Sequence, residues 1–291
     1  MDYLSLAKQI ATDVKAALLS DLKHKQGFSV HAQNEADTKS THHADNIAFH
    51  IITQHLESYP CQIFMEGFQF PKKDNPDFII YIDPLDGSLN WDRGIGDPCI
   101  ALAISEHLDN PTFDHLCFAY VEGLHSGDYY YTENEKSYFY SSLLENTQVI
   151  QCKGKTQLST ACGYLRLGYS KAEEQLLFSY PIFLQCRDIR AIENSNMELC
   201  ELARNAADFM IEARKTSDLY NLLAYPILKY AGGHIVNKVS ENLCHQIIQP
   251  NDIYDFIATT NPLLLEDILT SLNIFKQKKE HKTSLSTFTL L

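Results

Sequence analysis

The sequence lacks the features that mark membrane, secreted and zinc-binding proteins. Its 291 residues contain no apolar run that approaches 18 residues, so a transmembrane helix is not expected, and no signal peptide precedes the first helical pattern. The eight cysteines form no C-x-x-C pair and the twelve histidines form no H-E-x-x-H pair, so the usual zinc and thioredoxin-like sites are not indicated. These absences predict a protein of the reducing cytoplasm.

Positive charge is also scarce. The chain has 24 Lys and Arg against 37 Asp and Glu, which gives a net charge of −13. Such an acidic protein has no electrostatic reason to bind nucleic acid or an anionic membrane. If its substrate is a phosphate, a local cation has to attract it, and a bound divalent metal is the simplest candidate.

The composition is that of an ordinary globular protein, with 45% hydrophobic and 21% charged residues. Apolar spacing predicts helices over 2–23, 44–57, 196–206 and 218–231, the last one ended by Gly232-Gly233. Strands are predicted in QIFMEG, FIIYID, DFMIEAR and YDFIATTN, and several antiparallel strands between 98 and 140. A change of pattern near 145–160 divides the chain into an N-terminal half (1–150), a C-terminal half (151–274) and a flexible tail (275–291).

The most informative stretch is YIDPLDGSLNWD, residues 81–92. It ends an apolar strand with Asp83 and Asp86, which can face one point across a turn stiffened by Pro84, and the carbonyl of Leu85 adds a third oxygen. Oxygen ligands suit Mg²⁺. The N–H groups of Gly87-Ser88 suit a phosphate oxygen. The alternative is a plain surface turn, since Asp, Pro and Gly are common turn residues.

DPLDGSLN resembles the signature of the inositol monophosphatase family, which belongs to the Mg²⁺-dependent, lithium-sensitive phosphatases. Five further stretches are similar to family elements and occur in the same order: STHHADNIAFHIITQHL, FMEG, ADFMIEAR, YPILKYAGG and DFIATTN. The resemblance covers about residues 1–273. It implies an α+β fold, the layered αβαβα sandwich of the sugar phosphatases, and a homodimer.

The resemblance also implies the ligands of two or three Mg²⁺ ions. Glu66 stands at the family's first metal-ligand glutamate, and Asp83 would bridge two metals. The Leu85 carbonyl would serve the first metal and Asp86 the second. Gly67 replaces a second acidic residue of the family, which we expect to weaken the surroundings of the metal more than its direct ligands.

Two residues are expected to orient the attacking water. Ser88 occupies a family threonine position whose hydroxyl pairs with an upstream aspartate, and Asp45 is the matching partner. Gly87 and Ser88 would also bind the phosphate. The alternative for Asp45 is a helix N-terminal acid favoured by the helix dipole.

The family's W-D-x-A motif, whose aspartate binds the second metal, is missing. Position 220, where that aspartate is expected, is Tyr, and the nearest acidic residue is Asp218. We predict that Asp218 takes the role, with Pro226 marking an irregularity that absorbs the two-residue offset. The alternative is that Asp218 only caps the helix.

The substrate side departs from the family as well. Glu193 and Asn194 replace residues that line the polyol pocket, and Glu212 matches a glutamate that hydrogen-bonds a substrate hydroxyl. An extra carboxylate at Glu193 would repel a second phosphate. Arg190 and Arg214 are possible pocket bases, although each is more often a surface ion-pair partner.

The resulting hypothesis is a Mg²⁺-dependent phosphomonoesterase that hydrolyses a small phosphorylated polyol or sugar, inositol 1-phosphate-like by default, with metal-activated water. One alternative is a phosphatase of the same fold that acts on 3′-phosphoadenosine 5′-phosphate or fructose 1,6-bisphosphate. The other is a regulatory or binding relative with weak catalysis, which the missing W-D aspartate and Gly67 motivate.

Overall fold

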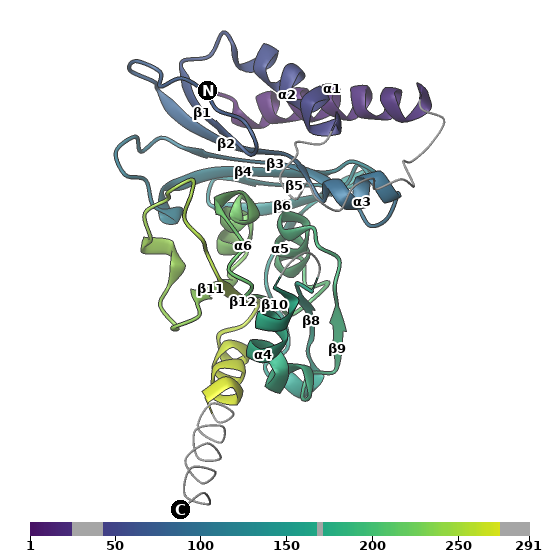
Figure 1. Ribbon diagram of the computed structural model, residues 1–291, viewed down its shortest axis with the longest axis vertical. Coiled ribbons are helices and arrows are strands. Elements are labelled where there is room, and N and C mark those ends of the chain that lie inside the picture. The colour runs from purple at the N-terminus through teal and green to yellow at the C-terminus, as the bar shows by residue number, and fades with distance from the viewer. Residues whose placement is uncertain (25–42, 168–170, 274–291) are drawn as a thin grey trace, which may run out of the picture.

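The computed structural model describes residues 1–24, 43–167 and 171–273. Two sheets and three helical layers alternate along the long axis of the molecule (Figure 1). The helices α1 and α2 cover the outer face of a seven-stranded sheet, α5 and α6 lie between the two sheets, and α4 covers the far side of a five-stranded sheet. This arrangement confirms the predicted α+β fold of αβαβα layers.

The first helical layer follows from the apolar spacing of its two helices, α1 (Tyr3–His24) and α2 (His43–Leu56). Ile10 and Val14 of α1 and Ile52 of α2 are fully buried. They join one hydrophobic cluster with the outer face of the first sheet. The two helices predicted here, over 2–23 and 44–57, are therefore confirmed to within one residue at each end.

All strands of the seven-stranded sheet come from the N-terminal half, and they pair in chain order. The first pair is parallel and the remaining pairs are antiparallel. The strands are β1 (Cys61–Met65), β2 (Phe78–Asp86), β3 (Cys99–Ser105), β4 (Leu116–Gly123), β5 (Tyr129–Glu133), β6 (Lys136–Ser141) and β7 (Asn146–Ile150). Between β2 and β3 lies the short helix α3 (Ser88–Arg93).

The C-terminal half forms the five-stranded sheet in the order β11-β12-β10-β8-β9. Its strands are β8 (Cys162–Leu165), β9 (Asp188–Arg190), β10 (Phe209–Glu212), β11 (His234–Asn237) and β12 (Phe256–Thr259). Its helices are α4 (Ala172–Phe183), α5 (Ser195–Ala203), α6 (Tyr225–Tyr230) and a last helix over 262–273. Single-turn 3₁₀ helices are Phe113–His115, Leu158–Thr160, Leu219–Leu222 and Leu243–His245.

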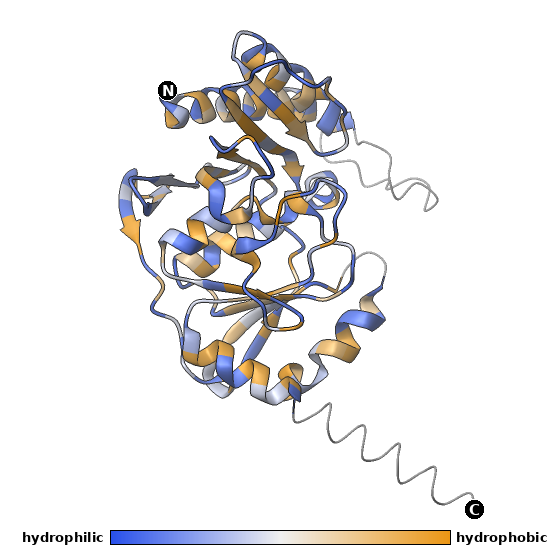
Figure 2. Ribbon diagram, turned by 90° about the vertical axis from the view of Figure 1, so that its left-hand side faces the viewer, coloured by the Kyte–Doolittle hydropathy of each residue, from blue (hydrophilic) through white to orange (hydrophobic). Residues whose placement is uncertain are grey.

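The largest hydrophobic cluster lies between the two sheets and takes residues from both halves of the chain. Tyr81 of β2, Leu199 of α5 and Leu223 before α6 all belong to it. Apolar positions accordingly concentrate on the strands and on the helices between them (Figure 2). The division at residues 150 and 151 stays a prediction, and the predicted tail, 275–291, lies outside the described residues.

The predicted single helix over 218–231 is wrong. The structure has a 3₁₀ turn at Leu219–Leu222 and then the short helix α6, with Pro226 at its N-terminal end. Proline lacks an N–H and is tolerated only in the first turn, so the chain restarts its helix there. Gly232, in the left-handed conformation with φ +90°, follows the helix as predicted. No helix within the described ranges is long and apolar enough to cross a membrane.

Candidate active site

The site begins at an irregularity in β2. Asp83 pairs with Ala101 of β3 and Asp86 pairs with Cys99, so three steps along β2 match two along β3. On a regular strand residues three apart point to opposite faces, whereas an extra residue in a bulge turns the second side chain back. The bulge therefore lets both buried aspartates, 5% and 7% exposed, face the same side.

Two more carboxylates belong to this cluster. Glu66 follows β1, and its N–H donates to the carbonyl of Ile82 at 3.0 Å. Its carboxyl group hydrogen-bonds that of Asp83, which requires a shared proton. Burial, and next the negative charge of Asp218, raise the pKa of Glu66 to about 8. Burial and the charge of Glu66 likewise raise the pKa of Asp83 well above its ordinary value.

Asp86 is held from the second half of the chain. The backbone N–H and the side-chain amide of Asn196 donate to one of its oxygens, Oδ2, at 2.7 and 3.2 Å. The same buried amide also donates to the carbonyl of Tyr220 and accepts from the N–H of Ala224. Burial raises the pKa of Asp86, and the positive charge of Arg166 opposes that shift. Asn196 thus fixes the Asp86 carboxylate relative to the 3₁₀ turn at Leu219–Leu222.

Asp218 is a cap in the structure, and its role as a metal ligand stays a prediction. It caps the 3₁₀ turn, where its Oδ1 accepts from the N–H of Tyr220 at 3.0 Å and from Nδ2 of Asn221 at 3.1 Å. Its charge also acts on Glu66, so its carboxylate belongs to the cluster. Burial raises the pKa of Asp218, and the two hydrogen bonds oppose the shift.

The donor set fits a hard divalent cation. Glu66, Asp83, Asp86 and Asp218 offer only oxygen, and their mutual repulsion is relieved here by a shared proton that a cation would replace. Oδ2 of Asp86 accepts a hydrogen bond from Asn196, and Oδ1 of Asp218 accepts one from the N–H of Tyr220. Each carboxylate would therefore bind metal through its other oxygen. Among the residues described, no three His, Cys, Asp or Glu side chains already stand in metal-binding geometry.

The turn after β2 is shaped by Gly87 and Asn194. Gly87 has φ +85°, and a Cβ added to it would lie 2.0 Å from Oδ1 of Asn194, so only glycine fits. Asn194 is fully buried, and its Oδ1 accepts from Nδ2 of Asn90 at 2.7 Å. Asn90 also donates to the carbonyl of Ile192 at 2.6 Å. The last residue of the DGSLN signature thus ties α3 to the second half of the chain.

Asp45 and Ser88 lie at the starts of α2 and α3, respectively. The charge of Asp45 contributes to the raised pKa of Glu66, so α2 brings its first turn toward the carboxylate cluster. Ser88 is the first residue of α3, where N–H groups have no partner within the helix. Both positions agree with the predicted roles, which stay predictions.

The predicted substrate side is occupied by a buried ion network. Glu212, 1% exposed, accepts from the backbone N–H and the guanidinium of Arg214 at 2.6–3.2 Å. Glu193 pairs with Arg166 at 3.0 Å and with Arg214 at 3.1 Å. A contact between Glu212 and a substrate hydroxyl would require Arg214 to move. The charge of Glu193 is compensated, so the predicted repulsion of a second phosphate is weakened.

Sequence reasoning missed Arg166, Asn196, Glu198 and Asn221. Arg166 is 5% exposed and lies 3.9 Å from Glu198 and 3.8 Å from Glu212. Asn221 accepts from Oγ of Ser195 at 2.7 Å. One signal was present for Asn196, because it follows two polar residues at the start of a helix that is otherwise buried. None was present for Arg166, whose importance comes from partners 27 to 55 residues away along the chain.

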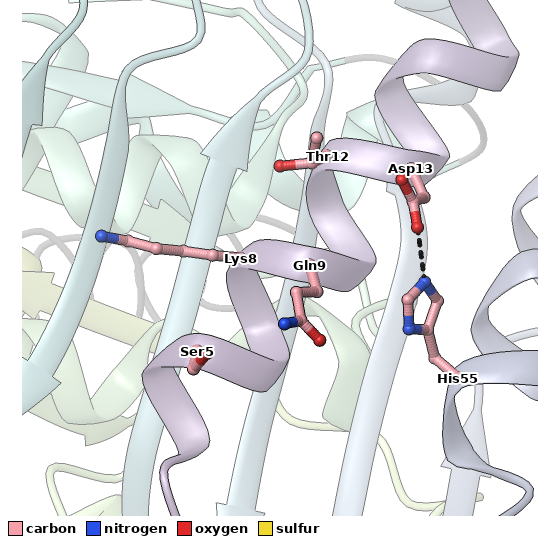
Figure 3. A pocket seen from close by; sticks show the side chains of 6 residues that line it. All are labelled: Ser5, Lys8, Gln9, Thr12, Asp13 and His55. Carbon is pink, nitrogen blue, oxygen red and sulfur yellow. Dashed lines mark hydrogen bonds and ion pairs between the residues drawn. The ribbon is translucent and has the colours of Figure 1, made fainter.

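A separate open pocket of about 330 Å³ lies at the α1 and α2 layer. It is lined by Ser5, Lys8, Gln9, Thr12, Asp13 and His55 (Figure 3). Asp13 and His55 pair across it at 2.8 Å. None of the predicted site residues lines this pocket, so it is not part of the candidate active site.

The chain belongs to the inositol monophosphatase family, whose model matches residues 2–254. The match includes β2, its bulge, the DPLDGSLN turn and Asp218. The resemblance seen in the sequence is thereby confirmed.

Individual relatives are distant. A bifunctional NADP phosphatase/NAD kinase of Methanococcus maripaludis is 24% identical over 261 residues, which are 82% of this chain and 44% of that protein. The chain therefore spans less than half the length of this curated relative. Among solved structures, an inositol monophosphatase of Thermotoga maritima has a TM-score of 0.72 at 17% identity, covering 96% and 99% of the two chains. The extragenic suppressor protein suhB of Bartonella henselae has a TM-score of 0.76 at 17% identity, covering 94% and 98%.

Proposed function

We propose that this chain is a metal-dependent phosphomonoesterase for a small phosphorylated polyol or sugar. The observation that carries the proposal is the set of four carboxylates, Glu66, Asp83, Asp86 and Asp218, gathered beside a glycine turn in a chain of this family. Two of these acids, Asp83 and Asp86, are buried and the other two are partly exposed, and so many neighbouring carboxylates destabilise the fold unless a cation balances them. A protein retains such a cluster when it binds that cation.

Mg²⁺, in two or three ions, is the metal that we propose. Glu66, Asp83 and the Leu85 carbonyl would hold one ion, and Asp83, Asp86 and Asp218 another. Bound there, the metal would lower the pKa of a water molecule and stabilise the charge of the leaving oxygen. Hard oxygen ligands and the absence of cysteine or histidine from this set favour Mg²⁺ over zinc.

The protein's own groups would bind and orient the reactants. The N–H groups at Gly87 and Ser88 would donate hydrogen bonds to the phosphate oxygens, which the partial positive charge at the start of α3 attracts. The Ser88 hydroxyl, paired with Asp45, would orient the attacking water in line with the leaving oxygen. Asn194 supports the turn from behind through its contact with Gly87.

The surroundings of the site bear on the substrate's leaving group. The arginines nearest the site, Arg166 and Arg214, are buried and paired with glutamates, so neither offers a ready site for a second phosphate. That favours a monophosphate over fructose 1,6-bisphosphate or 3′-phosphoadenosine 5′-phosphate. The NADP phosphatase named among the relatives motivates a nucleotide 2′-phosphate as a further substrate to be tested.

The test is phosphate release with titrated Mg²⁺ from inositol 1-phosphate, fructose 1,6-bisphosphate, 3′-phosphoadenosine 5′-phosphate and NADP. Wild type is compared with Asp83→Asn and with Asp109→Asn, an exposed aspartate between β3 and β4. We expect turnover of at least one monoester, lost in Asp83→Asn and kept in Asp109→Asn. Absence of turnover from every substrate at every Mg²⁺ concentration would favour the regulatory alternative.

A further inference from the structure

Two neighbouring strands of the five-stranded sheet are each followed by a buried arginine. Arg166 comes directly after β8, and Arg214 lies two residues after the end of β10. The two strands pair in parallel, with Leu165 opposite Ile211, so their carboxyl ends lie at the same edge of the sheet. Two buried guanidinium groups at one edge require anionic partners close by.

The carboxylate of Glu193 is the point at which these two strand ends converge. Its Oε2 accepts from Nε of Arg166 at 3.0 Å and from Nη1 of Arg214 at 3.1 Å. Its Oε1 accepts from the backbone N–H of Leu167 at 2.6 Å. Three N–H donors therefore point at one carboxylate, and two of them carry a positive charge. Without the glutamate, the same donors would form a binding site for a free anion.

The backbone of Glu193 is strained at this position. Its φ is +68°, in the left-handed region that favours glycine. Such a conformation persists only where the surroundings fix it, and it is common at functional sites. Here the three bonds to the carboxylate fix it, together with the bond from the N–H of Glu193 to Oε1 of Glu198 at 3.0 Å.

The carboxylate of Glu193 lies beside the candidate active site. Nη1 of Arg166 donates to Oδ1 of Asn221 at 3.5 Å, and Nδ2 of Asn221 donates to Oδ1 of Asp218 at 3.1 Å. The next residue in the chain, Asn194, packs against the glycine turn after β2. The side chain of Glu193 is 13% exposed, against 6% for that of Arg166, so the carboxylate is nearer to solvent than the guanidinium group it covers.

We propose that Glu193 is a specificity-determining residue, whose carboxylate fills an anion site that would otherwise bind a second anionic group of the substrate. The exclusion comes from occupancy of the donors rather than from repulsion, because the two guanidinium groups compensate the charge of the carboxylate. The inference rests on the proposed function and deepens it. It assigns as substrates phosphate monoesters whose leaving group carries hydroxyl groups and no further phosphate or carboxylate.

The direct test is sulfate binding to Glu193→Gly, because glycine suits the left-handed backbone and removes the carboxylate. Sulfate is titrated by calorimetry into metal-free protein, so that no metal-bound anion contributes. We expect saturable binding to the variant and none to wild type at the same concentrations. The matched control is Glu135→Gly, which replaces another left-handed glutamate, with φ +56°, in the exposed turn between β5 and β6. This control should behave as wild type.

The effect on specificity is measured as the ratio of kcat/KM for fructose 1,6-bisphosphate to kcat/KM for inositol 1-phosphate in the presence of Mg²⁺. We expect this ratio to rise at least about tenfold in Glu193→Gly and to keep its wild-type value in Glu135→Gly. Glu193→Gln keeps the volume of the side chain but binds the arginines less tightly, because its amide has no charge. In that variant the ratio should rise several-fold.

A folded Glu193→Gly that binds no sulfate and keeps the wild-type ratio would overturn the inference. If Glu193→Gly does not fold, an unchanged ratio in Glu193→Gln overturns it instead. Failure of the proposed function is distinguishable from failure of this inference. Wild type would then release no phosphate from any monoester, whereas sulfate binding needs no turnover and still reports whether the anion site exists.

Discussion

Asn196 decides how Asp86 is presented, although it is not itself a predicted ligand. It donates to Asp86 through both its backbone and its side chain, and it holds the 3₁₀ turn that carries Asp218. A polar residue that orients a metal ligand typically changes metal affinity by 10- to 100-fold when it is removed. The two candidate ligands of the second metal therefore depend on one buried amide.

We expect Asn196→Ala to raise the dissociation constant for Mn²⁺, used as a spectroscopic substitute for Mg²⁺, by about 10- to 100-fold. The reason is that Asp86 loses the side-chain hydrogen bond and keeps only the one from the backbone N–H, while the Tyr220 carbonyl and the Ala224 N–H lose their side-chain partner. Electron paramagnetic resonance of free Mn²⁺ measures the change. The control is Asn242→Ala, which removes a side-chain acceptor for the N–H of Cys244 in another 3₁₀ turn. An equal loss in both variants would contradict a specific role for Asn196.

Substitution of Asp218 tests whether this residue binds metal or only caps the 3₁₀ turn. If it binds the second metal, Asp218→Asn keeps an oxygen for the Tyr220 N–H but loses the charge, so the Mg²⁺ concentration for half-maximal turnover should rise at least about tenfold. Thermal stability should fall little, since asparagine caps as well as aspartate. If the Mg²⁺ dependence of Asp218→Asn equals that of wild type, Asp218 only caps the 3₁₀ turn and does not bind metal.

Glu198 predicts a pH dependence of stability. Burial raises the pKa of its carboxyl group to about 7, and the charge of Arg166 only partly opposes this. The folded protein therefore binds a proton that the unfolded chain releases near pH 4.5, and stability is lost as pH rises from there through 7.

We expect Glu198→Gln to remove that loss. Between pH 5 and pH 8 the unfolding free energy of wild type should fall, relative to that of the variant, by up to about 3 kcal/mol. Urea unfolding at both pH values measures it, and the other carboxylates cancel in the comparison. A constant difference between the two proteins would show that Glu198 is ionised throughout.

At the scale of elements, the turn between β2 and α3 depends on a glycine for two reasons. Gly87 has a positive φ, and its missing Cβ leaves room for Asn194. Gly232 also has a positive φ, but no atom lies within 4 Å of the place where its Cβ would stand. A comparison of alanine substitutions at these two glycines therefore separates the cost of backbone strain, which both share, from the cost of a steric clash, which only Gly87 has.

Gly87→Ala should therefore cost clearly more than Gly232→Ala. The left-handed conformation alone costs alanine about 1–2 kcal/mol, and at Gly87 the displacement of a fully buried asparagine adds to it. We expect a larger drop in melting temperature for Gly87→Ala and loss of phosphate release in that variant only. Equal destabilisation of the two would mean that Asn194 yields to the new methyl group at no cost.

At the scale of the whole molecule, the fold was largely accessible from the sequence because its periodic patterns are strong. The spacing of Ile10 and Val14 predicted α1, and the alternation after residue 98 predicted the antiparallel strands. The helix at 218–231 was misjudged because apolar spacing continues through Pro226, and only the missing N–H of proline interrupts the helix.

The site residues also fall into those that the sequence could predict and those that it could not. Asp83, Asp86 and Gly87 are adjacent in sequence, so a local motif contains them. Asn196 contacts Asp86 across the two halves of the chain, and Arg166 contacts Glu198 and Glu212 from a distant part of the C-terminal half, so no local pattern reports these contacts. Arg214 and Glu212 are only two residues apart, but the expectation that Glu212 faces the substrate left out their ion pair, which altered the expected surroundings of the substrate.

The central claim is that the four carboxylates form a metal site in which a divalent cation replaces the proton shared by Glu66 and Asp83. Calorimetric titration with Mg²⁺ in two buffers of different ionisation enthalpy tests it most directly, because it measures binding and proton release together. We predict saturable binding with release of about one proton near pH 7, and loss of both in Asp83→Asn. Binding without proton release, or binding that Asp83→Asn leaves unchanged, would contradict the account.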